Sequence, residues 1–316
     1  MNTTSTQALP GTPIQLDTDL PPNDFPSAPQ QYLLLHTRAL EDWAYRPSPP
    51  DSGVLAAYAP GVVDLVRAIS PLAVRRWLWE DPSLDPERGP LLVEATGETA
   101  LIHHAQAQWA PADGVLFIGA ECGMDELHRH LTSNVHIVMP DRGQALFAFI
   151  PGQLDAWLQA LAPEHRESWL GQITQLLWRD NLGPSHRWLK VDRPTPGSSE
   201  TQPGWLHLQL QELSAFEQRL REHFIISIAN ELLMIPGYDT LSQSQAQIQV
   251  RKTLTQLEER HFTADEHFRD CLLLLARHPE LQTDPAAHAL LNELDEPPSA
   301  RVRALAALAN EEEVQP

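Results

Sequence analysis

The stretch from residue 114 to residue 150 constrains the fold of this chain more than any other. It begins with the unbroken apolar run Val115–Ile118, which lies between two glycines. A run this short and this apolar is typical of a strand that is covered on both faces. Met124, Leu127 and Leu131 follow at spacings of three and four, which gives a short helix one apolar edge.

Two further strands are predicted at the end of this stretch. In the first, Val135–Met139, apolar residues alternate with others, and the second, Leu146–Ile150, is apolar and aromatic. Pro140, Asp141 and Gly143 lie between them and supply the turn chemistry of a hairpin. The order strand, helix, hairpin predicts that this stretch forms the centre of a β-sheet that helices cover.

The flanking segments extend this centre into a mixed α/β (α+β) lobe. Further strands are predicted at Tyr32–Leu35, Leu91–Glu94, Trp188–Val191 and Trp205–Leu210, and extended chain at Val54–Val66. Helices are predicted at Pro71–Trp79, Ala100–Trp109 and Leu154–Leu161.

The hydrophobic period changes after residue 210. Apolar residues recur every three or four positions over 213–232, which indicates a long amphipathic helix. A second helix is predicted at Ser242–Arg260, and a third opens at Thr263, which has the spacing of a capping box with Glu266. Shorter helices are predicted at Ala286–Leu294 and Ala300–Leu308. The sequence therefore predicts an all-α lobe after the mixed one.

The chain is predicted to have a Pro/Thr-rich leader at 1–30, the mixed α/β lobe at 31–210, the helical lobe at 211–309 and an acidic tail at 310–316. The leader has few large apolar residues and is expected to add little to the core. The loop 194–204 is rich in Pro, Gly, Ser and Thr and is predicted to separate the lobes.

The charge balance limits the partners. There are 22 basic and 42 acidic residues, a net charge of −20 at pH 7, which opposes binding of nucleic acid by a basic face. A solvated acidic surface and a basic protein partner both fit this balance. Cys122 and Cys271 match no ligand or redox spacing, and sparse thiols favour a reducing compartment. The sequence has no secretory signal and no stretch near the ~20 apolar residues of a membrane span, so a cytoplasmic protein is expected.

The 14 histidines raise the question of a metal site. His103 and His104 are adjacent, and His128 and His130 are two residues apart. Neither spacing places both imidazoles on one helical face, which needs three or four residues. No HExxH or cysteine-containing ligand pattern accompanies them, so no metal site is predicted.

Other candidates for chemistry have simpler explanations. Cys122 follows Glu121 at a strand end, but no pattern pairs it with a base, and it is expected to be a packing cysteine. Asp125-Glu126 open the short helix, where its dipole favours negative charge. Asp17-Thr18-Asp19 resembles a metal-sugar motif but lies in the leader. There is no GxSxG, no GxxxxGK[ST] and no GxGxxG, so neither catalysis nor a cofactor is predicted.

The order of segments carries a family resemblance. In order, these segments are QYLLLH, AAYAPGVVDLV, Gly114-Val115-Leu116, His130-Leu131, PDRG with an aromatic strand, Trp169-Leu170-Gly171 and the helical lobe. Over residues 31–279 this order resembles the family called domain of unknown function 4123, which comprises adaptor or chaperone proteins of type VI secretion.

The resemblance implies a function without catalysis. Members of that family are understood to bind a toxic effector in the cytoplasm and to help load it onto the VgrG spike. The implied partners are therefore an effector and the spike. The family tends to have Arg where this chain has Thr132, and arginines around the aromatic strand where this chain has 147–152 without them. The roles of those arginines are not carried over.

Two alternatives remain open on the sequence. An enzyme with a non-motif active site in the α/β lobe predicts a deep polar pocket near His103, His128 or His136. A regulatory scaffold that binds another protein without a link to secretion has the same sequence signature as the chaperone.

Overall fold

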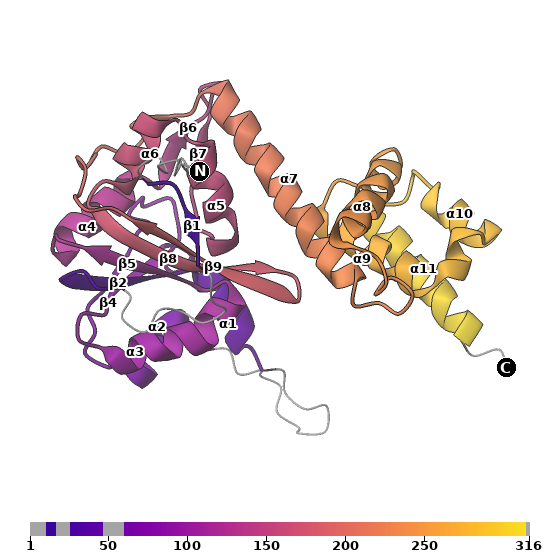
Figure 1. The fold of residues 1–316 in the computed structure, drawn as a ribbon, viewed down its shortest axis with the longest axis horizontal. Helices are drawn as coiled ribbons and strands as arrows, with labels where there is room; N and C mark the ends of the chain where they lie inside the picture. The colour runs from indigo at the N-terminus through magenta and orange to yellow at the C-terminus, as the bar shows by residue number, and fades with distance from the viewer. Residues whose placement is uncertain (1–10, 17–25, 47–59, 314–316) are drawn as a thin grey trace, which may run out of the picture. The chain divides into compact units, whose positions relative to one another are not determined.

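The computed structural model describes residues 11–16, 26–46 and 60–313 (Figure 1). Within these ranges the chain divides into two compact units. The first contains the residues up to 181 together with 186–220, and the second contains 182–185 and the residues from 221 onward. The division falls inside helix α7 (Leu210–Leu232), and the loop 194–204 lies within the first unit. The predicted order of a mixed α/β part and a helical part is confirmed.

A seven-stranded sheet forms the centre of the first unit, in the order β1-β9-β8-β5-β2-β4-β3. The strands are β1 (Ile14–Gln15), β2 (Gln30–Leu35), β3 (Arg75–Trp77), β4 (Leu91–Glu94), β5 (Val115–Ala120), β8 (Ile173–Leu182) and β9 (Ser185–Asp192). The predicted central strand is β5, which pairs antiparallel with β2 and β8 and is buried along its whole length.

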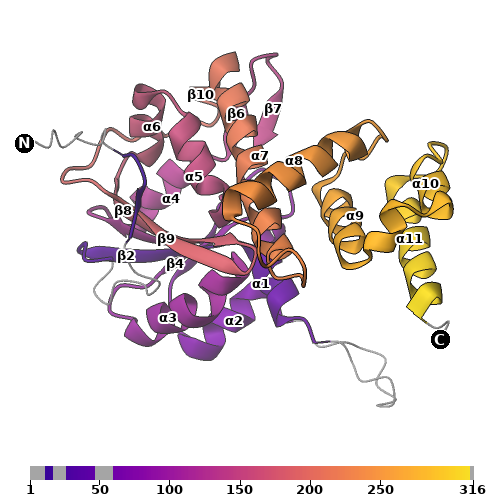
Figure 2. The ribbon, with the colours of Figure 1, turned by 45° about the vertical axis from the view of Figure 1, so that its right-hand side comes forward.

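Helices cover both faces of this sheet (Figures 1 and 2). On one side lie α1 (Thr37–Ala44), α2 (Val62–Ile69) and α3 (Thr99–His104), and on the other lie α4 (Met124–Ser133), α5 (Pro151–Ala160) and α6 (Pro163–Leu170). Successive side chains of a strand point to opposite faces. Val115 and Phe117 therefore enter the core beneath α1–α3, and Leu116 and Ile118 enter the core beneath α4–α6.

The predicted hairpin forms, but it does not join the central sheet. β6 (His136–Val138) and β7 (Gln144–Leu146) pair with each other, and β10 (Leu206–His207) pairs with β6 to complete a separate three-stranded sheet. The second strand ends earlier than predicted because Phe149 has a φ of 53° and α5 begins at Pro151. Phe147 and Phe149 pack against Trp169 in the core instead.

Two predicted segments have the opposite structure. The segment Pro71–Trp79 is not a helix, because Arg75–Trp77 forms the edge strand that pairs with β4. Residues 62–66 are helical rather than extended, since Gly61 caps α2 at its N-terminus and the preceding proline does not interrupt it. Residues 54–59 of that prediction lie outside the described residues.

Part of the predicted leader belongs to the sheet. Ile14–Gln15 pairs antiparallel with Leu189 and Lys190 of β9, although the sequence assigned this segment to a flexible leader; both residues are exposed on the edge of the sheet. Residues 17–19, the Asp-Thr-Asp segment, lie outside the described residues. The predicted strand Trp205–Leu210 is shorter in the structure, because α7 already begins at Leu210.

The second unit is helical. Beyond α7 it contains α8 (Gln243–Glu258), α9 (Asp265–Arg277), the 3-10 helix η4 (Pro279–Gln282), α10 (Pro285–Leu291) and α11 (Pro298–Glu313), so the helix α11 continues into the predicted tail. Ser242 caps α8 in a capping box with Gln245. The predicted box at Thr263 does not form, because α9 starts at Asp265 and its N-cap is Ala264.

The hairpin tip between β8 and β9 is part of this helical unit. Asn230 of α7 donates hydrogen bonds through Nδ2 to the backbone oxygen of Leu182 at 2.8 Å and to Oγ of Ser185 at 2.6 Å. None of the helices in the described ranges combines the length and the apolar character needed to cross a membrane.

Candidate partner-binding surface

Helix α4 covers the outer edge of β3. β3 is the last strand of the large sheet, and its hydrogen bonds to β4 continue at Leu78, whose N–H donates to Pro90. Hydrogen-bonded pairs alternate along an antiparallel ladder, so the carbonyl of Trp77 points away from β4. His128 Nε2 donates to this carbonyl at 2.8 Å, and Asp125 forms an ion pair of 2.5 Å with Arg76. The predicted candidates His128 and Asp125 therefore close a sheet edge.

His130 holds the loop 194–204 on α4. Its ring is fully buried, with Nε2 at 3.0 Å from the carbonyl of Trp169 and Nδ1 at 3.2 Å from the carbonyl of Glu200. Burial lowers the pKa of His130, and the two carbonyls oppose that effect. Asn134 supports the same joint, because its amide bonds Trp169 and Trp205. Both ring nitrogens of His130 thus lie within hydrogen-bond distance of a backbone carbonyl oxygen.

The remaining predicted candidates lie apart from one another. His103 is exposed on α3, while His104 contacts the Trp109 ring at 5.1 Å, and burial lowers its pKa. Cys122 is buried, and burial raises the pKa of its thiol to about 11, which disfavours the reactive thiolate. Within the described ranges, no group of three or more His, Cys, Asp and Glu side chains could hold a metal ion.

In contrast to β3, the outer edge of β7 is open. β7 is the last strand of the small sheet and pairs only with β6. The N–H of Phe147 donates to the carbonyl of Val135, and the N–H of Met139 donates to the carbonyl of Gly143. The hydrogen-bonded pairs of this ladder therefore fall at odd positions. The backbone groups of Gln144 and Leu146 consequently point outward. No described residue hydrogen-bonds to them.

A hollow of about 480 Å³ adjoins this edge. Its lining comes from the segment after β3, from α4, from the β6–β7 hairpin and from the loop before β10. Glu80 and Asp81 give it acidic groups, and Gln144 joins it to the open strand. Thr132 also lines it, and its Oγ1 is buried without a hydrogen-bond partner among the described residues. The hollow therefore offers two carboxylates.

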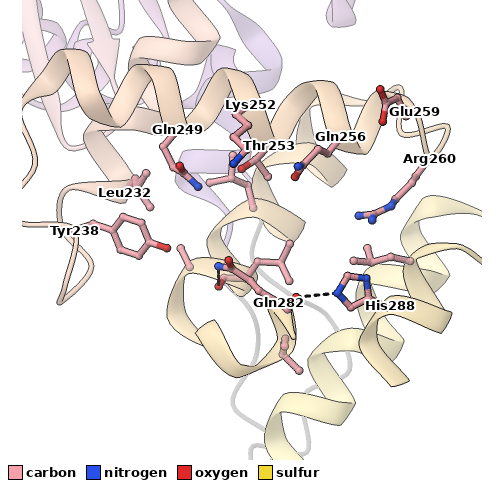
Figure 3. Close-up of a pocket in the computed structure, with 15 residues that line it drawn as sticks. Leu232, Tyr238, Gln249, Lys252, Thr253, Gln256, Glu259, Arg260, Gln282 and His288 are labelled. Carbon is pink, nitrogen blue, oxygen red and sulfur yellow. Dashed lines mark hydrogen bonds between the residues drawn. The ribbon is translucent and has the colours of Figure 1, made fainter. Parts of the chain in front are cut away.

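A second cavity, of about 410 Å³, lies within the helical unit (Figure 3). Its apolar lining includes Leu272, Leu281 and Leu291, which are buried side chains of the helical core. Its polar groups come mainly from one face of α8, and His288 of α10 lies across from them. The α8 residues are Gln249, Lys252, Thr253 and Gln256, followed by Glu259 and Arg260 just beyond the helix.

Two hydrogen bonds fix the orientation of the groups around this cavity. Arg260 donates through Nε to Oδ1 of Asn292 at 3.1 Å, which leaves its two terminal nitrogens available. His288 donates through Nε2 to the backbone oxygen of Gln282 at 2.8 Å (Figure 3). Sequence reasoning proposed neither this cavity nor the open edge of β7.

Comparison with known families supports the resemblance inferred from the segment order. Residues 54–168 match the model of the family described as domain of unknown function (DUF4123). The matched residues run from ahead of α2 into α6 and include β3 and β7, the covered and the open edge strands. Comparisons with curated proteins and with solved structures give no significant match.

Proposed function

We propose that this chain, whose residues 54–168 match the DUF4123 family, is a cytoplasmic chaperone or adaptor of type VI secretion. In this proposal it binds a toxic effector, stabilises it and helps to load it onto the VgrG spike, without catalysing a reaction. The observation that supports it most directly is the open β7 edge within the matched residues. A chaperone of this kind needs a preformed surface for a client, and an unpaired strand is such a surface.

The client segment binds by strand addition. An extended segment of the effector pairs with the outward backbone groups of Gln144 and Leu146 and becomes the next strand of the small sheet. Leu146 is 40% exposed and offers an apolar contact on the same strand. Main-chain hydrogen bonds give affinity in this mode, and side-chain pockets give specificity.

The adjoining hollow selects a basic side chain. Glu80 and Asp81 carry negative charge in its lining. A Lys or Arg side chain of the client supplies the positive charge and the donors that this set lacks. The net charge of −20 also favours approach of a basic segment.

The contrast between the edge strands β3 and β7 supports a function for β7. Exposed strand edges promote aggregation, and proteins usually cover them. In this unit α4 covers β3 through His128 and Asp125. The β7 strand, Gln-Ala-Leu, has no charged residue or proline of its own. Because β3 is covered and β7 is not, the open edge of β7 suits a strand that pairs with a partner protein.

The test is retention of this chain by a tagged effector when both are produced together. Leu146→Pro removes the outward N–H but leaves the hydrogen bonds to β6 intact, so effector binding should be lost while the melting temperature stays near that of the wild type. Leu146→Val keeps the N–H and is the matched control. A folded Leu146→Pro variant that binds as tightly as the wild type overturns strand addition.

The wider proposal has its own outcome. If the wild-type chain is never retained by the effector, and deleting it changes neither effector stability nor secretion, the chaperone function is wrong. Retention of a different cellular protein through the same edge, with no effect on secretion, indicates a regulatory scaffold instead.

A further inference from the structure

The cavity of the helical unit is lined by two cationic side chains, Lys252 and Arg260, and by the carboxylate of Glu259. In the described part of the chain, no carboxylate forms an ion pair with Lys252 or Arg260. Two other arginines of this unit, Arg251 and Arg269, form ion pairs with Glu222 and Glu231. In a chain with a net charge of −20, an unpaired guanidinium at a cavity is an anion site.

The geometry of Arg260 favours a carboxylate. Its Nε is held by Asn292, so the guanidinium is fixed in orientation while its terminal nitrogens remain free to donate. In Figure 3 the Arg260 guanidinium lies above the His288 ring, on the same side of the cavity. A planar guanidinium with free donors matches a carboxylate in a bidentate arrangement.

The rest of the lining specifies what carries the carboxylate. Leu272, Leu281 and Leu291 form an apolar part of the lining, the leucine floor, against which an aliphatic side chain can pack. The amides of Gln249 and Gln256 can each donate and accept, which suits the peptide groups of a chain. A fatty acid offers no such groups beyond its carboxylate. The volume of about 410 Å³ suits a small ligand and not a folded element.

We infer that this cavity binds the C-terminal residue of a partner protein, with its α-carboxylate at Arg260 and an aliphatic last side chain on the leucine floor. A C-terminal residue carries both groups on one Cα, and the same cavity is lined by Arg260 and by the leucines. Capture of chain ends by fixed donors is a known recognition mode. This site is separate from the β7 edge and does not depend on strand addition.

The test uses the full chain and fluorescein-labelled pentapeptides in an anisotropy titration. The peptides are Gly-Ser-Gly-Val-X, where X is Val, Leu, Ile, Met or Phe, each with a free carboxylate and each as its C-terminal amide. At least one free-acid peptide should bind saturably, and amidation should weaken it roughly tenfold or more, because a charge-assisted hydrogen bond is stronger than a neutral one.

Variants assign the binding to the cavity. Arg260→Gln should weaken binding of the free-acid peptide about as much as amidation of the peptide does. Arg260→Lys should recover part of the affinity, because it keeps the positive charge but lacks the planar guanidinium. Arg303→Gln is the matched control, since Arg303 is exposed on α11 and does not line the cavity. Its affinity should equal that of the wild type.

Several results overturn the inference. The first is that no free-acid peptide binds saturably up to roughly 1 mM, which is a weak limit for specific recognition. The second is that the free acid and the amide bind with equal affinity. The third is that Arg260→Gln and Arg303→Gln lose the same amount of affinity for the free acid. An amidated peptide with an internal Asp-Leu pair that binds as tightly as the free acid excludes a chain end. Dodecanoate that binds more tightly than every peptide identifies a fatty-acid site instead.

Discussion

His128 Nε2 donates a 2.8 Å hydrogen bond to the backbone oxygen of Trp77, and this contact places a helix side chain over the edge of the large sheet. The carbonyl accepts, so Nε2 must carry the proton, and the neutral ring suffices. Glu80 lies 3.9 Å from the other ring nitrogen. The joint between α4 and β3 thus contains this buried imidazole together with the Asp125–Arg76 ion pair, and the contribution of His128 can be tested on its own.

Replacing His128 with Ala should destabilise the first unit by about 1–3 kcal/mol, since it leaves a carbonyl without its hydrogen bond. It should also promote self-association through the uncovered strand. Urea unfolding and analytical ultracentrifugation measure the two effects. His103→Ala is the control on an exposed histidine. A His128→Ala variant as stable and as monodisperse as this control would show that the contact is dispensable.

His130 should make stability depend on pH. Burial lowers its pKa in the folded state, so the unfolded chain binds the proton more readily. Stability is fully present above the unfolded pKa of about 6.5 and falls as the pH drops below it, by at most about 1.4 kcal/mol per pH unit for one proton. Urea midpoints between pH 7.5 and pH 5 measure this.

A His130→Gln variant should show a smaller decrease over the same range. Some decrease should remain, because the pKa values of His36 and His104 are lowered by burial as well. An identical pH profile in the wild type and the variant contradicts the assignment to His130.

Arg301 should stabilise the helical unit in particular. It is buried, donates through Nη1 to the backbone oxygen of Leu291 at 2.8 Å, and its guanidinium carbon lies 4.7 Å from the centre of the Phe262 ring. Arg301→Ala should therefore cost about 2–4 kcal/mol, from the lost charged hydrogen bond and the lost cation–π contact.

The position of the tryptophans separates the two units in this experiment. All nine tryptophans lie at or before Trp205 and belong to the first unit. Arg301→Ala should thus shift the unfolding transition seen by far-UV circular dichroism more than the one seen by tryptophan fluorescence. Arg303→Ala, an exposed change on the same helix, should shift neither. Equal stability of both arginine variants contradicts the role of Arg301.

Both thiols should react only after unfolding. Cys122 and Cys271 are buried, and burial raises the pKa of their thiols to about 11 and about 12. The thiolate is the reactive form, so iodoacetamide at pH 8 should label the native chain slowly and the urea-unfolded chain fast. Peptide mass mapping assigns each site. Rapid labelling of native Cys122 would indicate that the strand end is accessible.

The strongly patterned elements could be predicted from the sequence. β5 was predictable because a short apolar run between glycines suits a doubly covered strand, and α7 because its period of three to four persists over many turns. β3 was not, because Pro71 resembles a helix start and three residues carry too little pattern to oppose it. The pairing partner β4, distant in sequence, decides its conformation.

The candidate binding surfaces were harder to predict. An open edge depends on which strands fail to find a neighbour, and the local sequence of β7 does not contain that information. The helical cavity did leave a signal. Polar residues recur at helical spacing beside the buried residues of α8, namely Gln249, Lys252, Thr253 and Gln256. The sequence alone could therefore predict one polar face of this helix, but not what that face lies against.

The hydrogen bonds of Asn230 with Leu182 and Ser185 affect how this protein can be divided for experiments. A fragment that starts at residue 221 omits the hairpin tip, so the Asn230 amide loses both acceptors and Gly183 no longer packs beside Ser227. Expressing the helical unit alone therefore calls for the tip to be grafted back through a linker. The order of residues along the chain is a poor guide to where it can be cut.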